Sequence, residues 1–191
     1  KAITDGRFVE QIIPVEIKVK RDIVHFKVDE HPKTTTSEVL AGLRTVFQKD
    51  GTVTAGNASG INDGAAAIVL ASSTAADHAG LKPKFRILGY GHAGVRPSVM
   101  GIGPVPAVKN LLSKIGLSIA DFDVIESNEA FAAQAIAVNR ELGLDPKRVN
   151  PNGGAIALGH PVGATGTIIM VKLMAELERS GGKKGLATMC I

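Results

Sequence analysis

The sequence predicts an α/β protein whose second half alternates strands and helices into a largely parallel sheet covered by helices. Three observations support this prediction. From residue 85 onward, short apolar runs alternate with stretches whose apolar residues recur at helical spacing. Hydrophobic residues make up 45% of the 191 residues, which is enough for a core. Two glycine-rich segments interrupt the pattern and resemble functional loops rather than linkers.

The first part of the chain predicts a hairpin, a helix and a loop. Residues 11 to 28 alternate between apolar and polar side chains around a break at Arg21 and Asp22, which predicts two antiparallel strands. Residues 37 to 46 carry apolar side chains on one side of a short helix. Residues 51 to 64 are too rich in Gly, Ala, Ser and Asn for regular structure, so we expect an irregular loop.

The middle of the chain predicts two strands and two helices. Residues 65 to 71 form a continuous apolar run that suits a buried strand, and residues 85 to 91 suit the next strand. A brief helix is expected between them at residues 74 to 79. A longer helix should begin at Pro104 and stop at Gly116, because Pro suits the first helical turn and Gly the residue after the last.

The last part continues the alternation. Residues 123 to 127 predict a short strand, and Asn128 precedes a helix with apolar residues at regular spacing from 131 to 142. After a strand-like glycine-rich segment, residues 169 to 181 predict an amphipathic helix that ends at its glycine pair, and residues 185 to 191 predict the final strand. In such sheets ligands bind at the carboxyl ends of the strands.

Three polar residues fall at those strand ends. His160 lies in NGGAIALGHPVGATG, residues 152 to 166, where Pro161 should hold it extended as an acid, base or hydrogen-bond donor. A lone His before Pro is more often structural, and the segment lacks both phosphate-binding glycine patterns. Asn128 is either a helix N-cap or an oxyanion donor. Cys190 is either a small buried hydrophobe or a reactive thiolate.

Charge and composition exclude several classes of protein. The net charge of +4 is spread along the chain, and one Tyr with no Trp argues against nucleic-acid binding. A single cysteine excludes a disulfide framework and a cysteine-rich metal site, and we predict no metal. No membrane-spanning apolar run or signal peptide pattern occurs, so we expect a cytoplasmic protein. Lys1 and the abrupt apolar end at Ile191 suggest a fragment.

Four segments in this order resemble the thiolases: NASGINDGAAA, SNEAFAAQAIAV, NPNGGAIALGHPVGATG and ATMCI. The resemblance to this family of acetyl-CoA acetyltransferases and 3-ketoacyl-CoA thiolases covers essentially the whole chain and matches the family's carboxyl-terminal half. It implies a five-layered α-β-α-β-α fold. It also implies three parts of the chain. Residues 1–61 would be the end of a loop domain with the substrate-contacting NAS loop, residues 62–80 the last piece of the amino-terminal domain, and residues 81–191 a truncated carboxyl-terminal domain.

The resemblance implies a role for each candidate residue. His160 would activate an acyl-accepting cysteine and donate to the thioester oxygen, and Asn128 would hold a water that completes the oxyanion hole. Cys190 would be the acid/base for the α-proton of acetyl-CoA. The substrate-binding residues would be those of the loop along the pantetheine arm and its tunnel: Ala55, Ala58, Ser59, Ala130 and Phe131.

The implied function is acyl transfer between coenzyme A thioesters, by Claisen condensation or thiolytic cleavage of 3-ketoacyl-CoA in fatty acid metabolism. The family's nucleophilic cysteine has no counterpart, because Cys190 is the only cysteine, so the isolated chain should be inactive. Expected partners are acyl-CoA, CoA, the enzyme's amino-terminal half and further copies in a homodimer or homotetramer, with no separate cofactor. Alternatives are a β-ketoacyl synthase, whose final motif usually differs, a non-catalytic CoA or lipid-carrier module, and a scaffolding protein.

Overall fold

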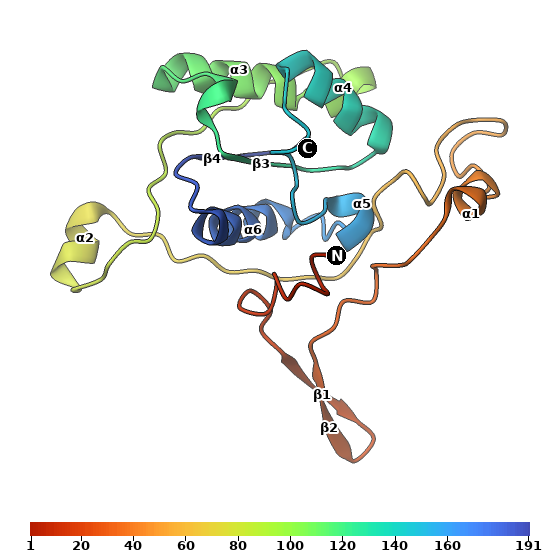
Figure 1. Cartoon of the computed structure of the whole chain (residues 1–191), viewed down its shortest axis with the longest axis horizontal. Coiled ribbons are helices and arrows are strands. Elements are labelled where there is room, and N and C mark those ends of the chain that lie inside the picture. Colours follow the sequence, from red (N-terminus) through yellow and green to blue (C-terminus); the bar gives the residue numbers. More distant parts are fainter.

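The computed structural model describes residues 1–191, and its packed part is a three-layer αβα arrangement (Figure 1). The middle layer is a parallel pair of strands, β3 (Val124–Ser127) and β4 (Gly185–Thr188). Helix α6 (Thr165–Ser180) lies on one side of the strands. Helices α3 (Pro104–Ile115) and α4 (Ala132–Leu142) lie on the other. The predicted parallel pairing and all three of these helices are confirmed.

Two apolar clusters fill the spaces between the layers. Because successive residues of a strand point to opposite faces, Val124 and Ile125 join different clusters. Val124 packs with Leu173 and Leu177 of α6. The larger cluster lies under α3 and α4 and contains Val105, Val108, Phe122, Ile125, Val138, Leu142, Leu144 and Leu186. This sandwich fixes where β3 and β4 end, and therefore where the residues that follow them lie.

Glycines end the three long helices. Gly116, Gly143 and Gly181 follow α3, α4 and α6 with φ angles of 67°, 64° and 75°. This left-handed conformation favours glycine, because the Cβ of any other residue would crowd the neighbouring backbone. The stops predicted at Gly116 and Gly181 are confirmed. Two short 3₁₀ turns, η1 (Pro97–Ile102) and η2 (Ile119–Asp121), flank α3.

Within the first ninety-six residues, a hairpin and two short helices extend away from this sandwich, while residues 62–66 run beside the start of α6 (Figure 1). The predicted hairpin is confirmed as β1 (Val15–Val19) and β2 (Asp22–Phe26), which pair antiparallel and are exposed throughout. Helix α1 (Ser37–Ala41) is shorter than the predicted 37–46, because the chain turns at Gly42. Helix α2 (Ser73–His78) forms one residue from its predicted position.

Two predicted strands do not form. Residues 65–71 and 85–91 make no backbone–backbone hydrogen bonds. Val69 and Leu70 are 89% and 72% exposed, although the apolar run predicted burial. A strand requires a neighbour to satisfy its N–H and C=O groups, and no strand of the chain runs beside either segment. The strand-like expectation for the glycine-rich segment is also wrong, since it contains the short helix α5 (Ala155–Leu158).

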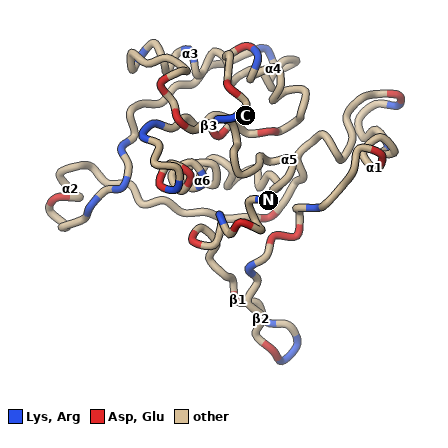
Figure 2. Tube along the Cα trace, in the orientation of Figure 1, with Lys and Arg blue, Asp and Glu red and all other residues tan.

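Charged residues of both signs are intermixed along the whole trace (Figure 2). Lys and Arg form no continuous patch in this view, which agrees with the spread of charge in the sequence. None of the helices combines the length and apolar character that crossing a membrane requires.

Candidate functional site

The imidazole of His160 is held by Thr165, the first residue of α6. Nδ1 of His160 lies 2.7 Å from Oγ1 of Thr165, whose hydroxyl donates to the carbonyl of Pro161 at 2.9 Å. A hydroxyl has one hydrogen, so Oγ1 must accept from Nδ1 of the imidazole. The neutral His160 therefore carries its proton on Nδ1, and Nε2 has a lone pair that can accept a hydrogen bond. Burial lowers the pKa of His160, which favours this neutral form.

Asn128 lies against that lone pair. It follows β3 directly, and its backbone N–H donates to the carbonyl of Thr188 at 2.9 Å, which ties the ends of β3 and β4 together. Its side-chain Nδ2 donates to Nε2 of His160 at 3.4 Å. The N-cap alternative is wrong, because the residue that caps α4 is Phe131. Oδ1 of Asn128 is buried and has no hydrogen-bond partner within the protein.

The irregular loop 51–64 contacts both the segment that follows Asn128 and the backbone of His160. The backbone N–H of Ser59 donates to the carbonyl of Ala130 at 3.0 Å, and Ala58 bridges to Phe131. The carbonyl of Gly60 accepts from the backbone N–H of His160 at 3.0 Å. Three segments distant in sequence therefore meet here.

Three predicted residues lie less centrally. Ala55 is exposed in the turn before these contacts, while the ring of Phe131 packs edge-on against Phe47 with centroids 6.0 Å apart. Cys190 is buried two residues beyond the end of β4, and burial raises the pKa of its thiol. The thiol makes no hydrogen bond with Asn128 or His160. It shares their end of the sheet through the Thr188 carbonyl that accepts from Asn128.

The sequence reasoning missed several residues that support the site. Oδ1 of Asn62 accepts from the backbone N–H of His160 at 3.2 Å, and Nε2 of His31 lies 3.1 Å from the carbonyl of Ile156. Asn150 and Glu129 hydrogen-bond to each other at 3.3 Å between the two loops. Three of these residues lie inside the motifs quoted above: Asn62, Glu129 and Asn150. Their polar side chains within a motif were the signal that the sequence offered. His31 had no such signal.

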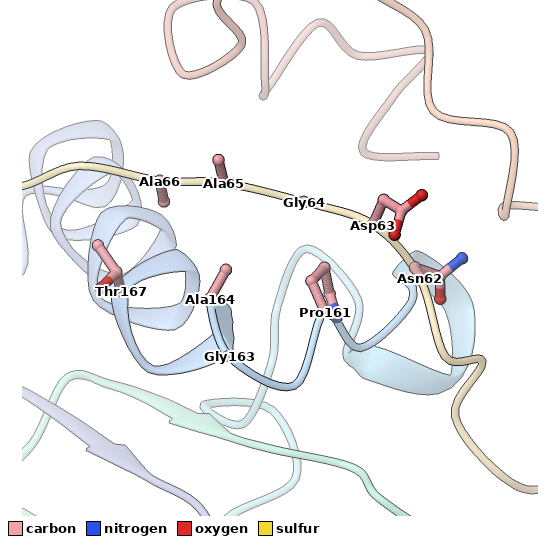
Figure 3. Close-up of a pocket in the computed structure, with 9 residues that line it drawn as sticks. All are labelled: Asn62, Asp63, Gly64, Ala65, Ala66, Pro161, Gly163, Ala164 and Thr167. Atoms are coloured by element: carbon pink, nitrogen blue, oxygen red, sulfur yellow. The ribbon is translucent and has the colours of Figure 1, made fainter.

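A groove of about 390 Å³ lies beside this site (Figure 3). It runs between the extended residues 62–66 and the start of α6, and it is lined by backbone and small side chains, with Asp63 as the only charged residue. None of Asn128, His160 and Cys190 lines it. We therefore take the contact between Asn128 and His160, and not this groove, as the centre of the candidate site.

Family models match most of the chain. The model of the thiolase C-terminal domain matches residues 81–191, and that of the thiolase N-terminal domain matches residues 1–74. The finer division of the chain at residues 61 and 80 stays a prediction.

Individual relatives agree with these models. The acetyl-CoA acetyltransferase of Syntrophomonas wolfei is 54% identical over 193 residues, covering 100% of this chain and 49% of the relative. The beta-ketoadipyl-CoA thiolase of Pseudomonas knackmussii is 56% identical over 194 residues, covering 100% and 48%. The chain thus spans about half the length of the curated relatives it matches.

Solved structures show the same fold. The crystal structure of the Bacillus anthracis acetyl-CoA acetyltransferase has a TM-score of 0.96 at 53% identity and covers 100% of this chain and 48% of its own. The structure of human mitochondrial 3-ketoacyl-CoA thiolase in complex with CoA has a TM-score of 0.93 at 50% identity, with 100% and 47% covered. The mixed α/β fold described above is half of the thiolase fold, and this chain belongs to the thiolase family.

Proposed function

We propose that the chain supplies the carboxyl-terminal half of the active site of an acyl-CoA acyltransferase of the thiolase type. The observation that carries the proposal is the contact of 3.4 Å between Nδ2 of Asn128 and Nε2 of His160. It joins two motifs thirty-two residues apart at the carboxyl end of a parallel strand, where sheets of this kind bind ligands. A nucleophilic cysteine would come from the amino-terminal half.

His160 would act twice in acylation. The lone pair on Nε2 of its neutral imidazole, which accepts from Asn128, would take the proton of the nucleophilic thiol. The resulting imidazolium would then donate from Nε2 to the oxygen of the thioester. Protonated Nε2 no longer accepts from Asn128, whose amide then becomes free to donate toward the same region. The pKa of His160, lowered by burial, keeps the base available at neutral pH.

Asn128 would complete the oxyanion hole to which His160 donates, and Cys190 would act on the α-proton. Asn128 would hold a water at the oxyanion, and its buried, unpartnered Oδ1 suits an acceptor for such a water. In condensation the thiolate of Cys190 would take the α-proton of acetyl-CoA, and the enolate carbon would displace the enzyme thiolate from its acyl group. In cleavage the thiol of Cys190 would protonate the departing carbon. Burial raises its thiol pKa, so the proton-donating form prevails at neutral pH.

The substrates we propose are coenzyme A thioesters. The acyl group is left open, since relatives of nearly equal identity are named for acetyl-CoA and for beta-ketoadipyl-CoA. The solved relative in complex with CoA supports CoA as the common ligand. Ala58, Ser59 and Ala130 would line the pantetheine arm with small side chains. Assembly as a homodimer or homotetramer, a cytoplasmic location and the lack of a separate cofactor stay predictions.

The test uses the complete enzyme with both halves and a Cys190→Ala variant. We expect the wild type to cleave acetoacetyl-CoA with CoA. The variant should lose about 10² to 10⁴ in condensation and in exchange of the acetyl-CoA methyl protons, as is usual for a general base, while its other cysteine is still acylated. Wild-type exchange in the variant would refute the role of Cys190. CoA binding without turnover in the wild type would favour the carrier-module alternative.

A further inference from the structure

The side chain of Asn150 extends the sheet at the point where the backbone leaves it. Val149 forms a parallel bridge with Ile125 of β3, and the backbone N–H of Asn150 donates to the carbonyl of Ile125 at 2.8 Å. Asn150 then turns with a φ of 46°, a conformation that Asn tolerates better than most residues. Beyond this turn, the side chain of Asn150 makes the hydrogen bonds to β3 that a further strand residue would make. Oδ1 accepts from the backbone N–H of Ser127 at 2.9 Å, and Nδ2 donates to the carbonyl of Ser127 at 2.8 Å.

The second hydrogen of the same amide reaches Glu129. Nδ2 of Asn150 donates to Oε1 of Glu129 at 3.3 Å, and Oε2 of Glu129 accepts from the backbone N–H of Ile156 at 3.2 Å. A carboxylate accepts with both oxygens and donates with neither, so it suits two donors on opposite sides. Gly154 leaves the space that this carboxylate fills, because a Cβ there would collide with it.

These contacts surround Asn128 on both sides. Ser127 before it and Glu129 after it are both fixed by Asn150. Glu129 in turn fixes Ile156, which lies in the same loop as His160 and four residues before it. One chain of hydrogen bonds therefore runs from the Asn128 turn to the His160 loop without passing through either of those side chains. These bonds therefore link the backbone on both sides of Asn128 to the segment that carries His160.

We propose that Asn150 and Glu129 are positioning residues that set the distance between Asn128 and His160, and that they act as a polar pair whose donor and acceptor directions must match. The proposal rests on the proposed function only for its catalytic readout. Neither residue needs to contact substrate. Loss of the pair should therefore lower kcat and leave KM nearly unchanged.

The experiment is a double-mutant cycle in the complete enzyme with Glu129→Gln, Asn150→Asp and both together. In Glu129→Gln the amide faces a donor at either Asn150 or Ile156, so one bond is lost. In Asn150→Asp two carboxylates face each other. In the double variant the new amide donates to the new carboxylate, so that contact returns with reversed polarity, and the oxygen of the new amide accepts from Ile156 as Glu129 did. Only the bond to the Ser127 carbonyl stays broken.

We expect each single variant to lower the acylation burst by roughly 10- to 100-fold, the range set by one hydrogen bond to a charged group. The double variant should be at least tenfold faster than Asn150→Asp. Hydrogen exchange at the Ile156 amide, followed by mass spectrometry, should speed up in Glu129→Gln and slow again in the double variant. Glu129→Asp, which is too short to reach both donors, should behave like Glu129→Gln.

Matched controls are Glu178→Gln and Asn110→Asp, because both residues make surface contacts far from these loops in sequence. Both should keep the wild-type burst. The proposal is overturned if Glu129→Gln keeps the wild-type burst and Ile156 protection, or if the double variant is no better than Asn150→Asp. If the wild-type enzyme transfers no acyl group, the proposed function fails, while Ile156 exchange still decides whether the pair holds the loops.

Discussion

Residues 1–96 and residues 97–191 differ sharply in how they use their apolar side chains. Of the 25 buried residues of the chain, only Ala76 lies in the first region. Of the 27 large hydrophobic residues that are exposed, 22 lie there, including Ile61, Val69 and Tyr90. The second region buries its apolar residues between β3, β4 and three helices. Both regions contain apolar runs in sequence, but only residues 97–191 contain the partners that bury them.

The comparison shows that an apolar pattern specifies a face to be buried and does not specify what buries it. Residues 65–71 have the composition of a buried strand, yet they lie extended and exposed. We propose that the amino-terminal half of the enzyme covers this region. The region still contributes to the site, because Ser59 and Gly60 hydrogen-bond to the loops of Asn128 and His160.

The largest expected effect is complete loss of activity in the isolated chain. Residues 1–191 hold His160, Asn128 and Cys190 but no second cysteine, so no acyl-enzyme can form at the family's nucleophile. We expect no cleavage of acetoacetyl-CoA above background by the purified 191-residue chain. Turnover comparable to that of the complete enzyme would contradict both the fragment interpretation and the role of a missing nucleophile.

The next effect compares the cores of the two regions directly. Ile125→Ala removes a fully buried side chain and should cost about 2 to 5 kcal/mol in the free energy of unfolding of the chain. Leu70→Ala should cost about 0.5 kcal/mol or less, because Leu70 is 72% exposed. Urea denaturation followed by circular dichroism measures both. In the complete enzyme the cost of Leu70→Ala should rise, and an unchanged cost would show that nothing covers this region.

The third effect concerns the point where the two regions meet. His160→Ala in the complete enzyme should lower acylation at least a hundredfold, because losing one oxyanion donor alone costs about 3 kcal/mol. Asn128→Ala should cost less, since it only releases a held water. A pre-steady-state burst measures acylation, and circular dichroism controls for folding. Near-normal acylation in His160→Ala would show that the histidine has a structural role, which is the more common role of a lone His before Pro.

The smallest effect lies wholly within the packed region. Thr165→Val removes the acceptor for Nδ1 of His160 and should slow acylation roughly tenfold, since the other tautomer becomes accessible. Thr167→Val is the matched control on the same helix and should have little effect.

The pH dependence tests the same contact. Burial lowers the pKa of His160, and the neutral base is the active form. The acylation rate of the wild-type enzyme should therefore stay constant down to pH 7 and fall only as the pH drops below about 6.5. A fall that begins above pH 7 would contradict the assignment of a neutral His160 at pH 7.

Local chemistry in the sequence was sufficient for several elements. The hairpin β1–β2, the helices α3, α4 and α6, and the stops at Gly116 and Gly181 follow from alternation, helical spacing and glycine's freedom at positive φ. His160 and Asn128 were predicted from their places at strand ends and from the motifs, and the structure brings their side chains together. The predictions of the helices, the hairpin and the glycine stops succeed because each depends on neighbours within a few residues, while the roles of His160 and Asn128 stay predictions.

Other features depend on partners far away in the chain, and the sequence alone could not specify them. The strands predicted at 65–71 and 85–91 fail because hydrogen-bond partners are a tertiary property. The Nδ1 proton of His160 follows from the direction of the Thr165 hydroxyl, which only the folded loop fixes. The pairing of Asn150 with Ser127 and Glu129 spans more than twenty residues. The sequence by itself predicted which residues to examine, from their places at strand ends and from the motifs. The tertiary structure decided which atoms face each other, because side-chain orientation follows from packing between segments and not from local preference.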